Sequence, residues 1–81
     1  MQDENSEMVA LAVNETLDNQ LTSGDPPATK QTLDRLISSG HDEQAARQLI
    51  AEVLLLEIRA VMATGEPYDN ARYTRALSQL T

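Results

Sequence analysis

The sequence contains no cysteine, which excludes disulfide bonds, thiolate nucleophiles and cysteine-based metal sites. It also contains no Phe or Trp and only two Tyr, so it offers no aromatic platform on which bases or sugars could stack. Basic residues are scarce too: six Lys and Arg against thirteen Asp and Glu give a net charge of −7. Because phosphate backbones repel such a surface, we expect no nucleic-acid partner.

Long hydrophobic runs are also missing. The longest unbroken apolar run is the six residues Met8–Val13, and the third predicted helix holds only four in a row, Val53–Leu56, whereas a membrane-spanning helix needs about 20 apolar residues. Residues 1–7 are acidic and polar, the opposite of the basic segment that opens a signal peptide. The lack of cysteine fits a reducing compartment. We therefore expect a cytoplasmic protein that does not associate with membranes.

The few glycines and prolines, three of each, stand where helices are expected to stop and restart. Asp25 and Asp69 are expected to cap the helices that follow them. Hydrophobic periodicity between these breaks predicts helices over residues 6–22, 26–39, 42–64 and 70–80. We predict a disordered segment at residues 1–5 and, over residues 6–81, a single all-α domain with a compact four-helix fold.

The third of these helices is the most apolar part of the chain. Twelve of the fifteen residues from Leu49 to Ala63 are apolar, too many for one stripe on one face. A helix that is apolar nearly all round is a central one that its neighbours cover on most sides. We therefore predict that residues 42–64 form the buried centre of the fold, with both Leu54 and Leu56 in the core.

Four polar residues are candidates for chemistry. Glu57 interrupts the apolar surface of the third helix, and Arg72 or Arg75 could reach it to form a buried ion pair. His41 is the only histidine, whereas a zinc site needs three or four ligands dominated by His or Cys. We predict no catalytic, cofactor or metal site. An alternative interpretation is a small ligand-binding or enzymatic bundle that uses Glu57, His41 and Arg72 or Arg75.

A longer pattern covers residues 26–73. It consists of residues at helix breaks and on helix faces: Pro26, Pro27, Leu33, Leu36, Gly40, His41, Ala45, Ala46, Arg47, Ile50, Glu57, Ile58 and Tyr73. This pattern resembles a bacterial family of small helical proteins without an assigned function. The resemblance implies a compact helical domain and supplies no activity.

The function that the sequence favours is a protein–protein interaction module without catalytic activity. Three apolar residues on the outer sides of the predicted helices, Leu11, Leu55 and Met62, are candidates for an exposed contact surface. The partner is expected to be another protein or a second copy in a symmetric dimer. A helix-turn-helix regulator is disfavoured, because the third helix is apolar where a recognition helix carries Arg, Asn or Gln.

Overall fold

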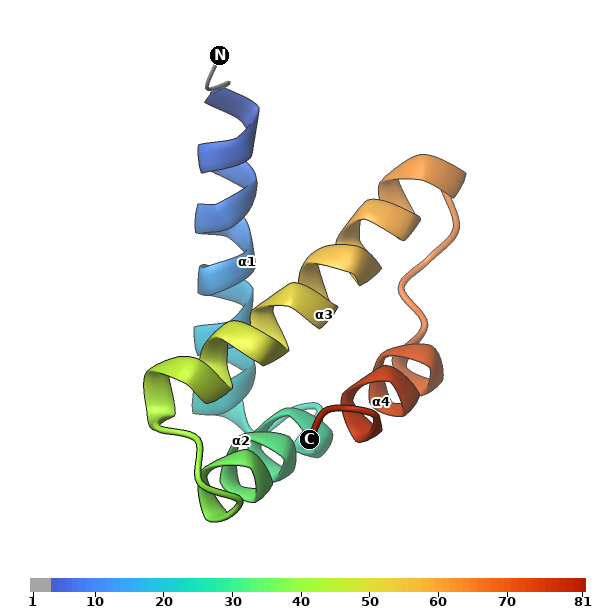
Figure 1. The fold of residues 1–81 in the computed structure, drawn as a ribbon. Helices are drawn as coiled ribbons and strands as arrows, with labels where there is room; N and C mark the ends of the chain where they lie inside the picture. Colours follow the sequence, from blue (N-terminus) through green and yellow to red (C-terminus); the bar gives the residue numbers. More distant parts are fainter. Residues whose placement is uncertain (1–3) are drawn as a thin grey trace.

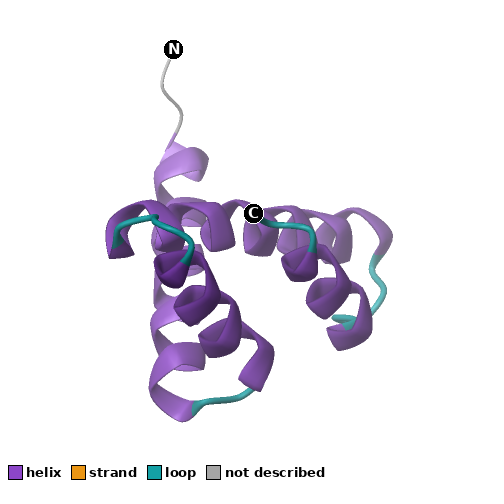
Figure 2. Ribbon diagram, turned by 60° about the horizontal axis from the view of Figure 1, so that its bottom comes forward, coloured by secondary structure: helices purple, strands orange, loops and turns teal. Residues whose placement is uncertain are grey.

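The computed structural model describes residues 4–81, with side chains from residue 8 onward, and contains four helices joined by short loops (Figure 2). The helices are α1 (Glu4–Ser23), α2 (Pro27–Ser38), α3 (Glu43–Thr64) and α4 (Asn70–Ser78). No strand occurs within residues 4–81. The all-α, four-helix fold predicted from the sequence is confirmed. Helix α1 begins two residues earlier than predicted, and residues 1–3 of the expected disordered segment lie outside the described residues.

Local capping explains where most helices begin and end. The Asp42 carboxylate accepts a hydrogen bond of 2.7 Å from the Ala45 amide, and Asp69 accepts one of 3.1 Å from the Arg72 amide. Gly65, with φ of 74°, closes α3 in the left-handed conformation that glycine adopts without a steric penalty. The predicted cap at Asp25 is wrong: α2 begins at Pro27 with Pro26 as its N-cap, so Asp25 lies too far from the free amides.

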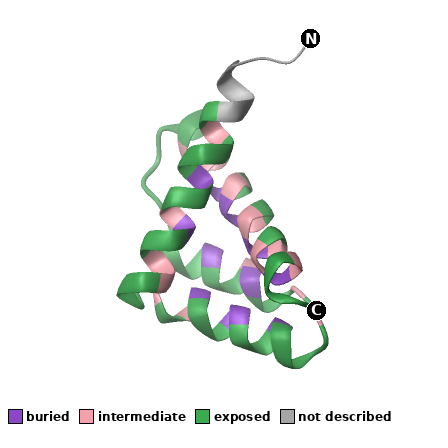
Figure 3. Cartoon of the chain, turned by 90° about the vertical axis from the view of Figure 1, so that its left-hand side faces the viewer, coloured by how far each residue is buried: buried purple, intermediate pink, exposed green. Residues whose placement is uncertain are grey.

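The core lies between the helices, where Figure 3 shows the buried positions turned inward. Helices α2 and α3 each pack against all three other helices. The buried apolar side chains come from every helix: Val13, Leu17, Leu33, Leu36, Ala46, Ile50, Leu54, Tyr73 and Leu77. Spacings of three and four residues within each helix place these side chains on one face, as expected for amphipathic helices around a single core.

A buried polar cluster ties three helices together at one end of this core. The Gln20 side-chain oxygen on α1 accepts hydrogen bonds from the Thr29 hydroxyl at 2.7 Å and the Tyr73 hydroxyl at 3.0 Å. Thr29 lies on α2 and Tyr73 on α4, and both are fully buried. Because an unpaired buried hydroxyl costs about 1–3 kcal/mol, this arrangement fixes how α4 sits on the other helices.

Helix α3 is central, but only one of its faces is buried. Ala46, Ile50, Leu54 and Glu57 face the core. In contrast, Leu56 is 66% exposed, so the prediction that neighbours cover α3 on most sides is wrong. Figure 1 shows the reason: the N-terminal half of α1 and the C-terminal half of α3 diverge, and α2 and α4 lie together on the other side of α3.

Candidate interaction surface on α3

The uncovered side of α3 forms a continuous strip along the helix. Successive residues of a helix are about 100° apart, so the polar residues Gln48, Glu52 and Arg59 lie on the side opposite Ile50 and Leu54. Leu49 and Leu56 lie along one edge of this polar centre, and Leu55 and Met62 lie along the other edge. We call this strip the outer face; it consists of Gln48, Leu49, Glu52, Leu55, Leu56, Arg59, Met62 and Ala63. Met62 is 73% exposed and Leu56 is 66% exposed, while Leu49 and Leu55 are half-buried. Large apolar side chains so exposed, on a helix in the middle of the fold, are typical of contact surfaces.

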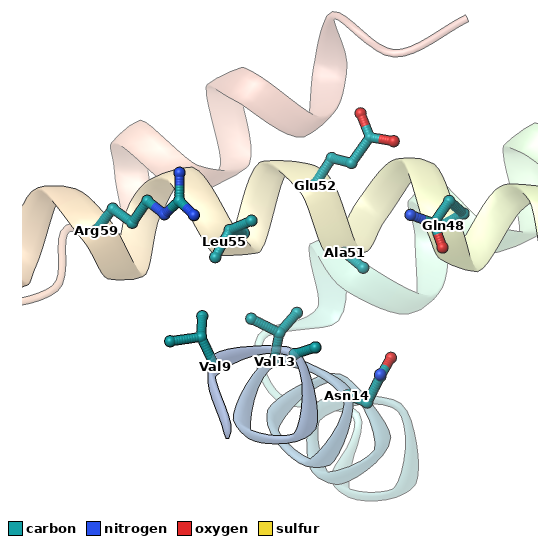
Figure 4. Close-up of a pocket in the computed structure, with 9 residues that line it drawn as sticks. Val9, Val13, Asn14, Gln48, Ala51, Glu52, Leu55 and Arg59 are labelled. Atoms are coloured by element: carbon teal, nitrogen blue, oxygen red, sulfur yellow. The ribbon is translucent and has the colours of Figure 1, made fainter. Parts of the chain in front are cut away.

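A groove between α1 and α3 continues the outer face on one side. Its volume is about 310 Å³. It is lined by four residues of α1 and five of α3: Val9, Ala10, Val13, Asn14, Gln48, Ala51, Glu52, Leu55 and Arg59. In Figure 4, Val9 and Val13 point from α1 toward Leu55 and Ala51 of α3, which gives the groove an apolar floor. The polar residues Gln48, Glu52 and Arg59 belong both to the groove and to the outer face.

Two opposite charges stand in the middle of the outer face. Glu52 and Arg59 are both exposed, and within the described residues neither forms an ion pair. Other charged residues of the chain do find partners, for example Arg47 with Asp18 across α3 and α1. Glu52 and Arg59 are seven residues apart, which is two turns of helix, so they project in nearly the same direction about 10 Å from each other.

The three residues predicted from the sequence as a contact surface do not all lie together. Leu55 lines the groove, and Met62 lies further along the outer face. Leu11 is 65% exposed, but it lies about 160° around α1 from Val13 and therefore points away from the groove. Sequence reasoning also missed Leu56, which it assigned to the core. The available signal was its position about 200° around the helix from Leu54, nearly on the opposite side.

The buried ion pair forms between Glu57 and Arg72. The Arg72 Nε atom donates to both carboxylate oxygens, at 3.0 and 3.1 Å, and Nη2 donates to Oε2 at 2.5 Å. The hydrogen bond from Arg72 lowers the pKa of Glu57 from its ordinary value of 4.5, against the opposing effect of burial. The Glu57 side chain is 7% exposed, while that of Arg72 is 44% exposed. Arg75 forms no ion pair with any residue the structure describes.

His41 lies apart from this pair. Its Nε2 atom is 3.1 Å from the backbone oxygen of Thr81, so it joins the start of α3 to the residues after α4. Arg35 does the same from α2, because it donates to the carbonyl oxygens of Leu77 at 3.0 Å and Leu80 at 2.7 Å. Cationic donors are favourable at the negative C-terminal end of a helix. Both contacts hold α4 in place, and no hydrogen bond or ion pair joins His41 to Glu57 among the described residues.

Residues 4–81 hold no group of three or more His, Asp or Glu arranged to bind a metal ion. No helix there combines the length and the apolar character needed to cross a bilayer.

No family model, curated protein or solved structure matches this chain. The resemblance of residues 26–73 to a bacterial family of small helical proteins therefore stays a prediction.

Proposed function

We propose that this chain is a protein–protein interaction module that binds helical partners on the outer face of α3 and in the adjoining groove. One observation carries the proposal: Leu56 and Met62 are 66% and 73% exposed on the helix around which the fold is built. Isolated exposed apolar residues are ordinary, but each of these two lies beside a half-buried leucine: Leu56 beside Leu49 on one edge of the outer face, and Met62 beside Leu55 on the other edge. Two apolar edges next to an open groove are suited to an amphipathic helix, which inserts side chains at a spacing of three to four residues.

The alternative interpretation, a ligand-binding or enzymatic bundle, has less support, because its residues are engaged in other contacts. Glu57 is occupied by Arg72, whose Nε atom bonds both of its carboxylate oxygens. His41 contacts Thr81, and neither Glu57 nor His41 lines the groove. A general acid or base needs a free position within hydrogen-bond reach of a substrate. Through these contacts, Glu57 and His41 hold α4 against the rest of the fold.

A site-specific photo-crosslinker tests the proposal. The photoreactive amino acid is placed at position 56, or at position 11 as a control, and the full chain is expressed in its native cell. Leu56 and Leu11 are equally exposed, at 66% and 65%, so random collisions would label both alike. We expect a discrete adduct with a second polypeptide at position 56 and none at position 11. Equal labelling at both positions, or none at position 56, would contradict the proposal.

A further inference from the structure

The outer face of α3 is arranged symmetrically along the helix. Its residues are arranged evenly about a point between Leu55 and Leu56. When two α3 helices are laid antiparallel about a two-fold axis at that point, residues whose numbers add to the same total lie at the same level along the pair. Glu52 then faces Arg59 of the second copy at the centre of the interface. The axis brings each edge against the same edge of the second copy, so Leu55 meets Leu55 and Leu56 meets Leu56.

The chemistry of each facing pair is complementary. Leu55 with Leu55 on one edge, and Leu56 with Leu56 on the other, bring apolar side chains together and remove them from water. Glu52 and Arg59 form two ion pairs related by the axis, and both residues lack a partner within the described chain. At an interaxial distance of about 8–10 Å, long Glu and Arg side chains reach across a helix pair.

The charges also exclude the other orientation. In a parallel pair Glu52 would face Glu52 and Arg59 would face Arg59, and like charges placed together across an interface weaken it strongly. Buried or half-buried polar residues at helix interfaces set register and orientation in this way. We propose that the partner on the outer face is a second copy of this chain, held in an antiparallel, two-fold arrangement by Glu52–Arg59 pairs. This proposal rests on the proposed function, because it names the occupant of that surface.

The net charge opposes this dimer at long range. Two copies of a chain with a net charge of −7 repel each other, and salt screens that repulsion beyond about 8–10 Å. The facing pairs at the interface are in contact and are screened less. We therefore expect moderate salt to strengthen the association, whereas an interface held only by exposed charges would be weakened.

Charge reversal tests the arrangement by sedimentation of the full-length chain from micromolar to millimolar concentration. The single variants Glu52→Arg and Arg59→Glu each place like charges at both facing pairs, so each is expected to dimerise at least about tenfold more weakly than the wild type. When the two variants are mixed, the arginine introduced at position 52 of one chain meets the glutamate introduced at position 59 of the other. The second facing pair of that mixed dimer keeps its native residues, Arg59 of the first chain and Glu52 of the second. The mixture is therefore expected to form a heterodimer as strong as the wild-type dimer.

Two controls separate this result from a general effect of charge. Glu52→Arg changes the net charge from −7 to −5, which reduces repulsion between copies, yet the proposal predicts weaker association. Arg75→Glu alters an exposed arginine on α4 and changes the net charge from −7 to −9, as Arg59→Glu does, so at moderate salt it should weaken the dimer far less than Arg59→Glu. Circular dichroism checks that each variant keeps its helices, which is expected because the substituted side chains are exposed.

The outcomes are distinct from those of the crosslinking experiment. A wild-type chain that stays monomeric across the range, or a mixture of reversed variants that stays monomeric, overturns the second copy as occupant. If position 56 still captures a different protein in that case, the interaction module stands and only its partner is changed. If neither experiment yields a complex, both proposals fall together.

Discussion

Removing either partner of the Glu57–Arg72 pair should destabilise the fold by different amounts. The Glu57 side chain is 7% exposed, whereas Arg72 is 44% exposed and can regain water when it loses its partner. Glu57→Gln keeps a hydrogen-bonding group of the same size, and we expect it to cost about 1 kcal/mol. Arg72→Met leaves the Glu57 carboxylate buried without a counter-charge. That unpaired carboxylate should cost about 2–3 kcal/mol at neutral pH, below the roughly 3–5 kcal/mol of fully buried pairs because the carboxyl group can take up a proton.

The pH dependence gives a sharper test, because its sign should reverse. In the wild type, Arg72 lowers the pKa of Glu57 from 4.5, so the unfolded state holds the proton more tightly. The stabilisation from the pair is therefore fully present above about pH 4.5 and is lost as the pH falls through the lower, folded-state pKa. Without Arg72, burial and the nearby Asp69 charge raise the pKa of Glu57, with only the Asp69 backbone amide opposing them. Arg72→Met should then lose stability as the pH rises above about 4.5.

Urea unfolding followed by circular dichroism between about pH 2.5 and pH 7 measures both effects. The proteins compared are the wild type, the two single variants and the double variant Glu57→Gln/Arg72→Met. At each pH, the free energy of unfolding of the Glu57→Gln variant is subtracted from that of the wild type, and that of the double variant from that of Arg72→Met. Each difference contains the contribution of Glu57 and cancels the contributions of the other titrating groups. Arg75→Met is the control, since Arg75 lies on the same helix without an ion pair among the described residues and should keep the wild-type slope. A wild-type slope in Arg72→Met, or equal losses in both single variants, would refute this account of the pair.

The remaining predictions concern packing, tyrosine ionisation and capping. Leu54→Ala should cost about 2–5 kcal/mol by thermal or chemical unfolding, while Leu56→Ala should cost under about 0.5 kcal/mol at concentrations where the chain is monomeric, because Leu54 is 2% and Leu56 66% exposed. Burial raises the pKa of Tyr73 and raises that of Tyr68 to about 12. Absorbance at about pH 10.5 should therefore detect less phenolate in the folded chain than in urea, where both tyrosines ionise near pH 10. Stability should accordingly fall as the pH rises above about 10. Asp42→Ala should cost about 1 kcal/mol through its lost cap, whereas Asp25→Ala should be nearly neutral.

The helix boundaries could be predicted from the sequence because local signals set them. Gly65 has φ of 74° and closes α3, and Asp69 caps α4, as their positions next to apolar periodic segments indicated. The failure at Asp25 has a local cause too. Two consecutive prolines follow it, and the sequence did not decide which of them begins the helix. The structure places Pro26 before the helix and Pro27 inside it.

The buried face of α3 carried only a weak signal in the sequence. Gln48, Glu52 and Arg59 lie within about 40° of one another, roughly opposite Ile50 and Leu54, but three polar residues do not show how far burial extends to either side of them. Leu56 lies next to this polar strip, and the packing of α3 against its neighbours leaves it exposed. The same holds for the choice between Arg72 and Arg75. They are three residues apart and so lie near one another on α4, and the packing of α4 decides which of them reaches Glu57. The Gln20 cluster depends on three helices at once and left no trace in the local pattern.

The lengths of the helices explain why α3 is left open. At 1.5 Å per residue, α3 with 22 residues is about 33 Å long, whereas α2 with 12 and α4 with 9 are about 18 and 14 Å. These two helices cover one side of α3, and α1 crosses it and then diverges (Figure 1). Helix α1, with 20 residues, is nearly as long as α3 but diverges from its C-terminal half, so these three helices leave the outer face of α3 uncovered. The exposed apolar side chains of Leu56 and Met62 are explained if another chain covers this part of α3. The opposite charges of Glu52 and Arg59, centred on that open face, favour a second copy as the source.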